Sequence, residues 1–163
     1  MIEKNKICIE NQGFAMKWVL DTVSIENLLE LARNKHNNMN LEQNKQNAIA
    51  FYKTAYMGDP KAAVEQYVGK EYIQHNPDVA DGTQGFINYF ERMQAEYPDK
   101  SIEFVRCIAE GNLVALHTHQ TWPGNDQYVT MDFFRFDENG KICEHWDAIQ
   151  QIPKESANPN TMY

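Results

Sequence analysis

The chain has 163 residues, a formal net charge of −8 and 42% hydrophobic residues, which fits one globular domain with a buried core. The acidic charge argues against nucleic acids and anionic membrane surfaces as partners, because both favour clustered Lys and Arg. No apolar run approaches the roughly 20 residues of a membrane-spanning helix. The cysteines, Cys8, Cys107 and Cys143, form no CxxC pair, which favours a reducing, cytoplasmic location.

Residues 1–40 differ in pattern from the rest of the chain, and we expect them to form an N-terminal appendage. Ser24 is a candidate N-cap for a short amphipathic helix that ends near Arg33. The tract NKHNNMN that follows is typical of a polar linker. The main domain is therefore predicted to cover residues 41–163.

Three helices are predicted at the start of this domain. Apolar residues at i, i+3, i+4 and i+7 predict an amphipathic helix over 43–57. Asp59 is a candidate N-cap, and the proline after it suits the first position of a second helix that ends near Val68. The aromatic stripe after the DG pair at 81–82 predicts a third helix, which Pro98 ends.

A β-rich pattern follows the helices. A brief strand in EYIQHNP precedes the third helix, and turn signals GN, PGND and NG separate the later strands. These later strands are predicted at 101–109, 113–122, 127–137 and 141–150. Three helices and an antiparallel meander predict an α+β fold.

The NG pair at 139–140 predicts how the last two strands pair. A two-residue loop brings opposite charges and aromatic rings together across the strands, which stabilises a sheet. A three-residue loop would instead place Asp132 opposite Trp146. We prefer the two-residue loop, which pairs Asp132 with Asp147, Phe133 with Trp146 and Arg135 with Glu144.

The other two turns predict the positions of the histidines in LHTHQ. PGND as a four-residue loop places His117 opposite Asp132 and His119 opposite Thr130, and the GN turn places Arg106 opposite His117. One face of the sheet is then predicted to carry His117, His119, Asp132, His145, Asp147 and Arg106, together with Ala115, Phe134, Ile108 and Ile149.

Apolar residues are predicted on the opposite face as well, so the sheet needs a cover on each side. We expect the helices to cover the polar face and to enclose a pocket. A second subunit or residues 1–40 would cover the outer face, whose predicted residues are Val114, Leu116, Val129, Met131, Phe133 and Trp146.

The order of the motifs YIQHNP, DG..GF..YF, IAEGNLVALHTH and MDFFRF..NGKICEHWD.IQ resembles the SnoaL-like polyketide cyclase family. The resemblance covers about Leu41 to Tyr163 and leaves residues 1–40 outside. It implies the cone-shaped α+β barrel that nuclear transport factor two and ketosteroid isomerase share, with three N-terminal helices packed on a strongly bent antiparallel sheet.

The resemblance also implies a chemistry. Cyclases of this family close a ring by an intramolecular aldol step, with an Asp in a D-x-x-R motif as general acid/base and a His on the neighbouring strand. The matching Asp is Asp132, and the matching His is His117 or His119. These three are the candidate catalytic residues, and no metal or organic cofactor is expected. The alternative for each of them is a structural, hydrogen-bonded core residue.

Further residues are candidates for substrate contact. His75 is expected at the pocket mouth or as a turn cap, and Arg106 either pairs with Asp132 or binds an anionic group. Phe134, His145 and Asp147 share the predicted pocket face. The His and carboxylate groups suit zinc or iron in kind, but their spacing matches no metal-binding signature, and we expect no metal.

The leading hypothesis is a cofactor-independent lyase or isomerase, which acts on a small carbonyl compound by Asp/His acid–base catalysis. A carbon acid needs a base whose pKa lies near the working pH and a donor to the developing enolate oxygen. The alternatives are a non-catalytic small-molecule-binding domain and a structural or dimerisation module. A homodimer through the outer sheet face is expected in either case.

Overall fold

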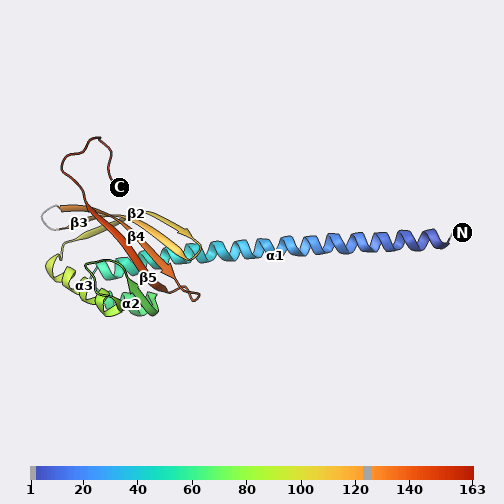
Figure 1. Ribbon diagram of the computed structural model, residues 1–163, viewed down its shortest axis with the longest axis horizontal. Helices are drawn as coiled ribbons and strands as arrows, with labels where there is room; N and C mark the ends of the chain where they lie inside the picture. The colour runs from blue at the N-terminus through green and yellow to red at the C-terminus, as the bar shows by residue number, and fades with distance from the viewer. Residues whose placement is uncertain (1–2, 123–125) are drawn as a thin grey trace. The chain divides into compact units, whose positions relative to one another are not determined.

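The computed structural model describes residues 3–122 and 126–163, with side chains described for 25–35, 37, 40–122 and 126–163. These residues form a mixed α+β structure (Figure 1). Its elements are α1 (Glu3–Tyr56), α2 (Pro60–Tyr67), β1 (Val68–Gln74), α3 (Gly82–Glu96), β2 (Ser101–Glu110), β3 (Leu113–Trp122), β4 (Asp126–Phe136) and β5 (Ile142–Gln151).

The chain divides into two compact units, Met1–Met39 and Asn40–Tyr163. Residues 3–39 are helical, so Ser24 lies within α1 and is not an N-cap. The helix continues through Arg33 and through the tract that was predicted to be a linker. That prediction is wrong because no Gly or Pro interrupts residues 14–57, and asparagine alone lowers helix propensity only by up to about 0.7 kcal/mol per residue.

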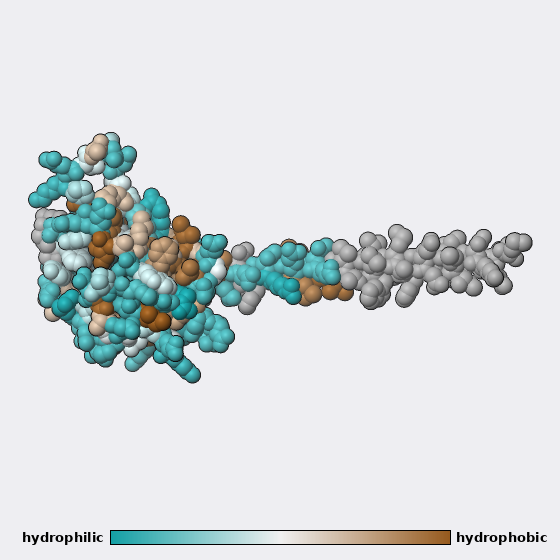
Figure 2. Space-filling view, viewed as in Figure 1, coloured by the Kyte–Doolittle hydropathy of each residue, from teal (hydrophilic) through white to brown (hydrophobic). Residues whose placement is uncertain are grey.

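The described side chains of the first unit include large apolar residues at the surface (Figure 2). Ile25, Leu28, Leu29 and Leu31 are 52–65% exposed. Among the described residues, no helix has the length and apolar character needed to cross a membrane.

The second unit packs residues 40–56 of α1, together with α2 and α3, on one face of the sheet. Apolar residues of α1 and α3 meet those of the sheet there, as the contact of Phe51 with both Phe86 and Phe134 illustrates. Asp59 caps α2 by accepting a hydrogen bond from the Ala62 N–H, as predicted. Asp81 precedes α3 and accepts the Gln74 N–H at 2.9 Å, so it ties the end of β1 to the helix.

Within the described residues, the sheet has five strands in the order β1-β5-β4-β3-β2. Four of them form the predicted antiparallel meander, and β1 adds to its edge in parallel with β5. The parallel register places Gln74 beside His145. The short strand predicted from EYIQHNP is therefore an edge of the main sheet, and it borders the candidate site.

The predicted pairs between β4 and β5 are confirmed, since Asp132 lies opposite Asp147 and Phe133 opposite Trp146. The two-residue loop from which they were predicted is wrong, because the register shifts after Arg135 and the Asp137 N–H donates to the Lys141 carbonyl. The predicted pairing of β3 with β4 is wrong by one residue, because Trp122 pairs with Asp126 and not with Gln127. The remaining residues of the predicted PGND loop, 123–125, lie outside the described residues.

A one-residue shift moves every side chain to the other face of a strand. His117 therefore lies opposite Met131, and His119 lies opposite Val129. An irregularity between Phe104 and Arg106 shifts the register of β2, which keeps Arg106 beside His117 but places Phe104 opposite Thr118. The predicted common face of Asp132 with the two histidines and Arg106 is wrong.

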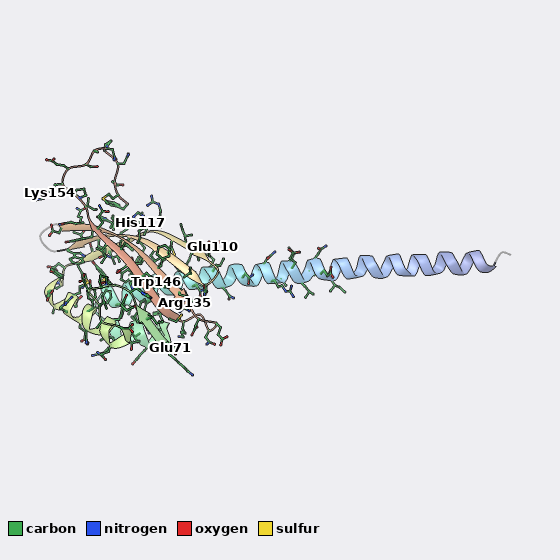
Figure 3. All side chains as sticks on the ribbon, in the orientation of Figure 1. Glu71, Glu110, His117, Arg135, Trp146 and Lys154 are labelled. Atoms are coloured by element: carbon green, nitrogen blue, oxygen red, sulfur yellow. The ribbon has the colours of Figure 1, made fainter. Side chains whose placement is uncertain are left out.

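The polar residues are instead divided between the two faces of the sheet. The helix-covered face carries Thr118, Gln120, Thr130, Asp132 and His145, all of which are buried. His117, on β3, belongs to the opposite, outer face (Figure 3). Val114 and Leu116, which were predicted on the outer face, are part of the buried core under the helices.

Candidate active site between the helices and the sheet

A pocket lies between α1, α3 and the inner face of the sheet, and its cavity volume in this structure is small, about 20 Å³. Its wall is largely aromatic, and its polar groups come mainly from the end of β1 and from β5. The lining residues that matter for its chemistry are Tyr52, Gln74, Asn76, His145 and Asp147, with Phe134 and Trp122 among the aromatic ones.

The polar groups of the pocket form two matched pairs across β1 and β5. Gln74 contacts His145, with 3.0 Å between Oε1 and Nδ1. Asn76 donates from Nδ2 to Oδ2 of Asp147 at 2.7 Å. The alternation of both strands turns the intervening residues outward, where His75 stacks on Trp146 with 4.8 Å between ring centroids.

The contact with Gln74 determines which nitrogen of His145 carries hydrogen. Oε1 of Gln74 also accepts the backbone N–H groups of His75 and Asn76, each at 3.0 Å. This atom is therefore the amide oxygen, and Nδ1 of His145 must donate to it. Nε2 is then the ring nitrogen of His145 that faces Asp132.

Nε2 of His145 lies 3.2 Å from Oδ1 of Asp132. Since neither atom can bond to the other without a hydrogen between them, the pair holds one shared proton, on the carboxyl group or on the ring. Asp132 is fully buried and does not line the pocket. It is therefore linked to the pocket indirectly, and His145 is its direct contact among the lining residues.

A line of buried hydrogen-bond donors ends at Asp132. Thr130 donates its hydroxyl to Oδ2 of Asp132 at 2.5 Å. Gln120 Nε2 donates to the Thr118 hydroxyl at 3.2 Å, and that hydroxyl lies 2.6 Å from the hydroxyl of Thr130. Because the Thr130 hydrogen points to Asp132, Thr118 must donate to Thr130. The arrangement stabilises negative charge on Asp132.

Asp147 is the carboxylate that reaches the pocket. Asn76 holds Oδ2, whereas Oδ1 makes no hydrogen bond to the described residues and is not a buried atom. Burial raises the pKa of Asp147 above its usual value, and the charges of Asp132 and Asp78 raise it further. The Asn76 hydrogen bond and the nearby His145 act in the opposite direction. A partly desolvated carboxylate with one free oxygen can accept a proton.

The tyrosines around these carboxylates keep their protons. Burial, followed by the charges of Asp132 and Asp147, raises the pKa of Tyr52 well above its usual value. The pKa of Tyr72 is raised by burial and by the same two carboxylates. These hydroxyls are therefore hydrogen-bond donors throughout the physiological pH range.

Asp132, His145 and Asp147 offer ligand atoms within 4.8 Å of one another, and their types suit a divalent metal. Binding a metal would require His145 to give up its contact with Asp132, because Gln74 occupies its other nitrogen. The hydrogen bonds already present therefore fit an acid–base cluster better than a metal site.

The structure separates the predicted site residues into two groups. Asp132, Phe134, His145 and Asp147 lie in or directly behind the pocket. His117 contacts Arg106 on the outer face, with 2.9 Å between Nδ1 and Nη1.

His119 also lies on the outer face, where it stacks on Tyr163 and contacts Gln127. His75 does not reach the pocket mouth, since it contacts Glu144 on the outer face at 2.8 Å. The predicted positions of His117, His119 and Arg106 are thus wrong, and so is the pocket-mouth alternative for His75.

Sequence reasoning missed Gln74, Asn76, Tyr52 and Gln120 as pocket residues. One signal was present, because the alternating pairs Gln74/Asn76 and His145/Asp147 have the same spacing. That signal has meaning only once β1 is known to pair in parallel with β5, and such a long-range contact leaves no turn in the sequence to mark it.

No curated protein matches the chain. Among solved structures, TsrD from Streptomyces laurentii has a TM-score of 0.56 and 20% identity over 65% of this chain and 87% of that one. A proposed polyketide cyclase from Bacillus cereus has a TM-score of 0.58 and 20% identity, over 66% of this chain and 74% of that one.

AclR, a proposed hydroxylase from Streptomyces galilaeus, has a TM-score of 0.57 and 18% identity over 68% of this chain and 90% of that one. At this level of identity the likeness concerns the fold alone. The model of the SnoaL-like domain matches residues 48–145, which contain most of the pocket wall. The chain belongs to the SnoaL-like domain family.

Proposed function

We propose that the protein is an isomerase or lyase that moves a proton at a carbon next to a carbonyl group. The observation that carries this proposal is the free Oδ1 of Asp147 in a mostly aromatic pocket. The raised pKa of Asp147 brings this base closer to neutral pH than a solvated carboxylate. Asp147 takes the proton from carbon and returns it at the position that the product requires.

Asp132 and His145 are proposed to support this step without contacting the substrate carbon. Their single shared proton keeps the pair neutral overall, so it adds no net charge beside the base. The contact with Asp132 also holds the His145 ring in place on the pocket wall next to Asp147. The catalytic role first expected of Asp132 is thus an indirect one, through His145.

The family supports a carbonyl substrate. The structure from Bacillus cereus is named as a proposed polyketide cyclase. The ring closure of a polyketide by an aldol step begins with the removal of a proton next to a carbonyl group. An aldol-type step of this kind needs no metal or organic cofactor, and we propose none. The bent sheet is proposed to enclose the substrate as a cone.

Two features outside the pocket belong to the same proposal. The outer face exposes Met131 and Phe133, 47% and 45% accessible, and we propose that a second copy of the chain covers them in a homodimer. The free thiols of Cys107 and Cys143 support a reducing, cytoplasmic location.

A non-catalytic ligand-binding domain is the second candidate. The hydrogen bonds of His145 favour this candidate, because both ring nitrogens of His145 already have partners within the protein. A binding domain would hold a ligand against the aromatic wall without exchanging its protons.

Hydrogen–deuterium exchange separates the two candidates. A panel of ketones and enones is incubated with the protein in D₂O, and exchange at the C–H groups next to the carbonyl is followed by NMR. If the protein is an enzyme, the wild type should catalyse this exchange, and the rate should fall by on the order of 100-fold or more in Asp147→Asn. Asp126→Asn is the matched control, since Asp126 is an exposed residue of β4. If the wild-type protein binds these compounds but does not catalyse the exchange of their protons, the proposal that it is an isomerase or lyase would be contradicted.

A further inference from the structure

Tyr52 offers a hydrogen-bond donor to the pocket that no described residue uses. Its hydroxyl oxygen accepts a long hydrogen bond of 3.5 Å from Gln120 Nε2, but no described residue accepts the hydroxyl hydrogen. The side chain is 6% exposed, and it lines the pocket. A buried donor without an acceptor is unfavourable by about 1–3 kcal/mol, so an acceptor on a ligand would be bound favourably there.

The other tyrosines of the pocket differ from Tyr52. Tyr56, one helical turn later on α1, has acceptors for its hydroxyl in the Ser101 carbonyl at 3.3 Å and in Gln120 Oε1 at 3.4 Å. Tyr89 is only half-buried, its ring contacts Arg92, and it borders two surface hollows outside the pocket. Tyr52 is therefore the deeply buried pocket tyrosine whose hydrogen is free.

Tyr52 and Asp147 face the pocket from different elements. Tyr52 comes from α1 and Asp147 from β5, and the charge of Asp147 acts on Tyr52. The Tyr52 ring also lies 6.0 Å from Phe134 and 6.5 Å from His145, between ring centroids. A ligand between the two walls would meet a proton acceptor on one side and a proton donor on the other.

The charges around the pocket restrict the ligand. Among the described residues, those that line it include Asp147 but no Lys or Arg. An anionic ligand would be repelled by Asp147 without gaining a cationic partner. The aromatic side chains favour a flat, apolar body.

We propose that the Tyr52 hydroxyl binds the carbonyl oxygen of the substrate, and that the substrate is an uncharged, mostly apolar carbonyl compound. This inference rests on the proposed function, in which Asp147 removes the proton next to that carbonyl. As the C–H bond breaks, its electron pair forms the enolate double bond, and the carbonyl π electrons move to the oxygen. Tyr52 stabilises that oxygen by hydrogen bonding, and the proton goes to Asp147.

Acetophenone labelled with ¹³C at its carbonyl group tests the proposal, and benzoate is the anionic comparison with the same ring. The infrared carbonyl band of acetophenone bound to the wild-type protein should lie below its position in an aprotic solvent. This measurement needs no variant. A band at the aprotic position would overturn the role of Tyr52.

Three Tyr→Phe variants then locate the donor. Tyr52→Phe should return the band towards the aprotic position and weaken acetophenone binding by about five- to tenfold, the loss of one neutral hydrogen bond. Tyr56→Phe and Tyr89→Phe should leave the carbonyl band at its wild-type position, because neither hydroxyl is proposed to bind the carbonyl oxygen. An unchanged band in Tyr52→Phe, or a shift only in Tyr89→Phe, would overturn the assignment.

Benzoate tests the substrate class separately, and it should bind at least tenfold more weakly than acetophenone. Equal affinity, or no binding of acetophenone, would overturn that class. The methyl protons of acetophenone test the proposed function in the same samples, because their exchange into D₂O requires the base. A lowered carbonyl band without catalysed exchange would contradict the function of Asp147 and leave the donor role of Tyr52 standing.

Discussion

Gln74 accepts a hydrogen bond from His145 across the parallel strands β1 and β5, with 3.0 Å between Oε1 and Nδ1. Two backbone N–H groups point at the same oxygen and fix the orientation of the amide. A residue at the sheet edge thereby determines the tautomer of a buried histidine, and the tautomer determines that His145 meets Asp132 through Nε2.

The first prediction concerns this bond. Gln74→Met removes the acceptor, so His145 should lose its fixed tautomer, and exchange should fall by on the order of 100-fold. The nitrogen chemical shifts of His145 report the tautomer directly. Gln74→Glu keeps an acceptor and should restore the shifts, whereas Gln84→Met, on the exposed face of α3, is the matched control. Unchanged shifts in Gln74→Met would contradict the assignment.

The sequence predicted most of the fold because its signals are local. Apolar spacing and turn residues defined the helices and strands of residues 41–163, and the pairing of Asp132 with Asp147 followed from charge and aromatic pairs across one hairpin. The helix over residues 34–40 was missed because an asparagine-rich tract resembles a linker, although nothing in it breaks a helix.

The site was predicted less well because it depends on register and on long-range contacts. Trp122 pairs with Asp126 and not with Gln127, so the register of β3 and β4 differs by one residue from the prediction. This difference places His117 and His119 on the opposite face of the sheet from Asp132. No local pattern marks that difference, since both histidines keep the same spacing in either register. The partner of Asp132 is His145, and the polar residues of β1 reach it only through the parallel pairing.

The second prediction follows from the new place of His117. This residue contacts Arg106 on the outer face, so His117→Leu should leave proton exchange unchanged. His145→Leu should abolish exchange, because it removes the partner of Asp132. The rates of both variants, measured on the same ketone, decide between the two histidines. A loss of exchange in His117→Leu comparable to that in His145→Leu would contradict the observed register.

The third prediction concerns the buried donors that end at Asp132. Thr130→Val conserves side-chain size but leaves Asp132 Oδ2 without its donor and Thr118 without its acceptor. The free energy of unfolding should fall by about 1–3 kcal/mol, as measured by urea denaturation. Thr121→Val, on the same sheet but only partly buried, should change it by less than about 0.5 kcal/mol. Equal effects of the two variants would contradict this role of Thr130.

The fourth prediction concerns stability and pH. Burial raises the pKa of Asp147 in the folded state, so between its unfolded and folded pKa values the folded protein binds more protons than the unfolded one. The contribution of Asp147 to stability is therefore present below the unfolded pKa and is lost as the pH rises through the folded pKa.

Asp147→Asn should consequently raise the melting temperature at pH 7, and the gain should shrink in acid. The side-chain amide introduced by this substitution would still accept the Asn76 hydrogen bond through its oxygen. Asp126→Asn, at an exposed site, should leave the melting temperature unchanged at both pH values. A lower melting temperature of Asp147→Asn at pH 7 would mean that the carboxylate stabilises the fold, contrary to the shift in its pKa.

The pH dependence of proton exchange by the wild-type protein tests the central claim most directly. If Asp147 is the base, the rate on a ketone substrate should rise with pH as this group loses its proton, with a midpoint above the 3.8 of an ordinary aspartate. Asp147→Asn should show no such rise. The same rise in Asp147→Asn as in the wild-type protein would contradict the assignment of Asp147 as the base.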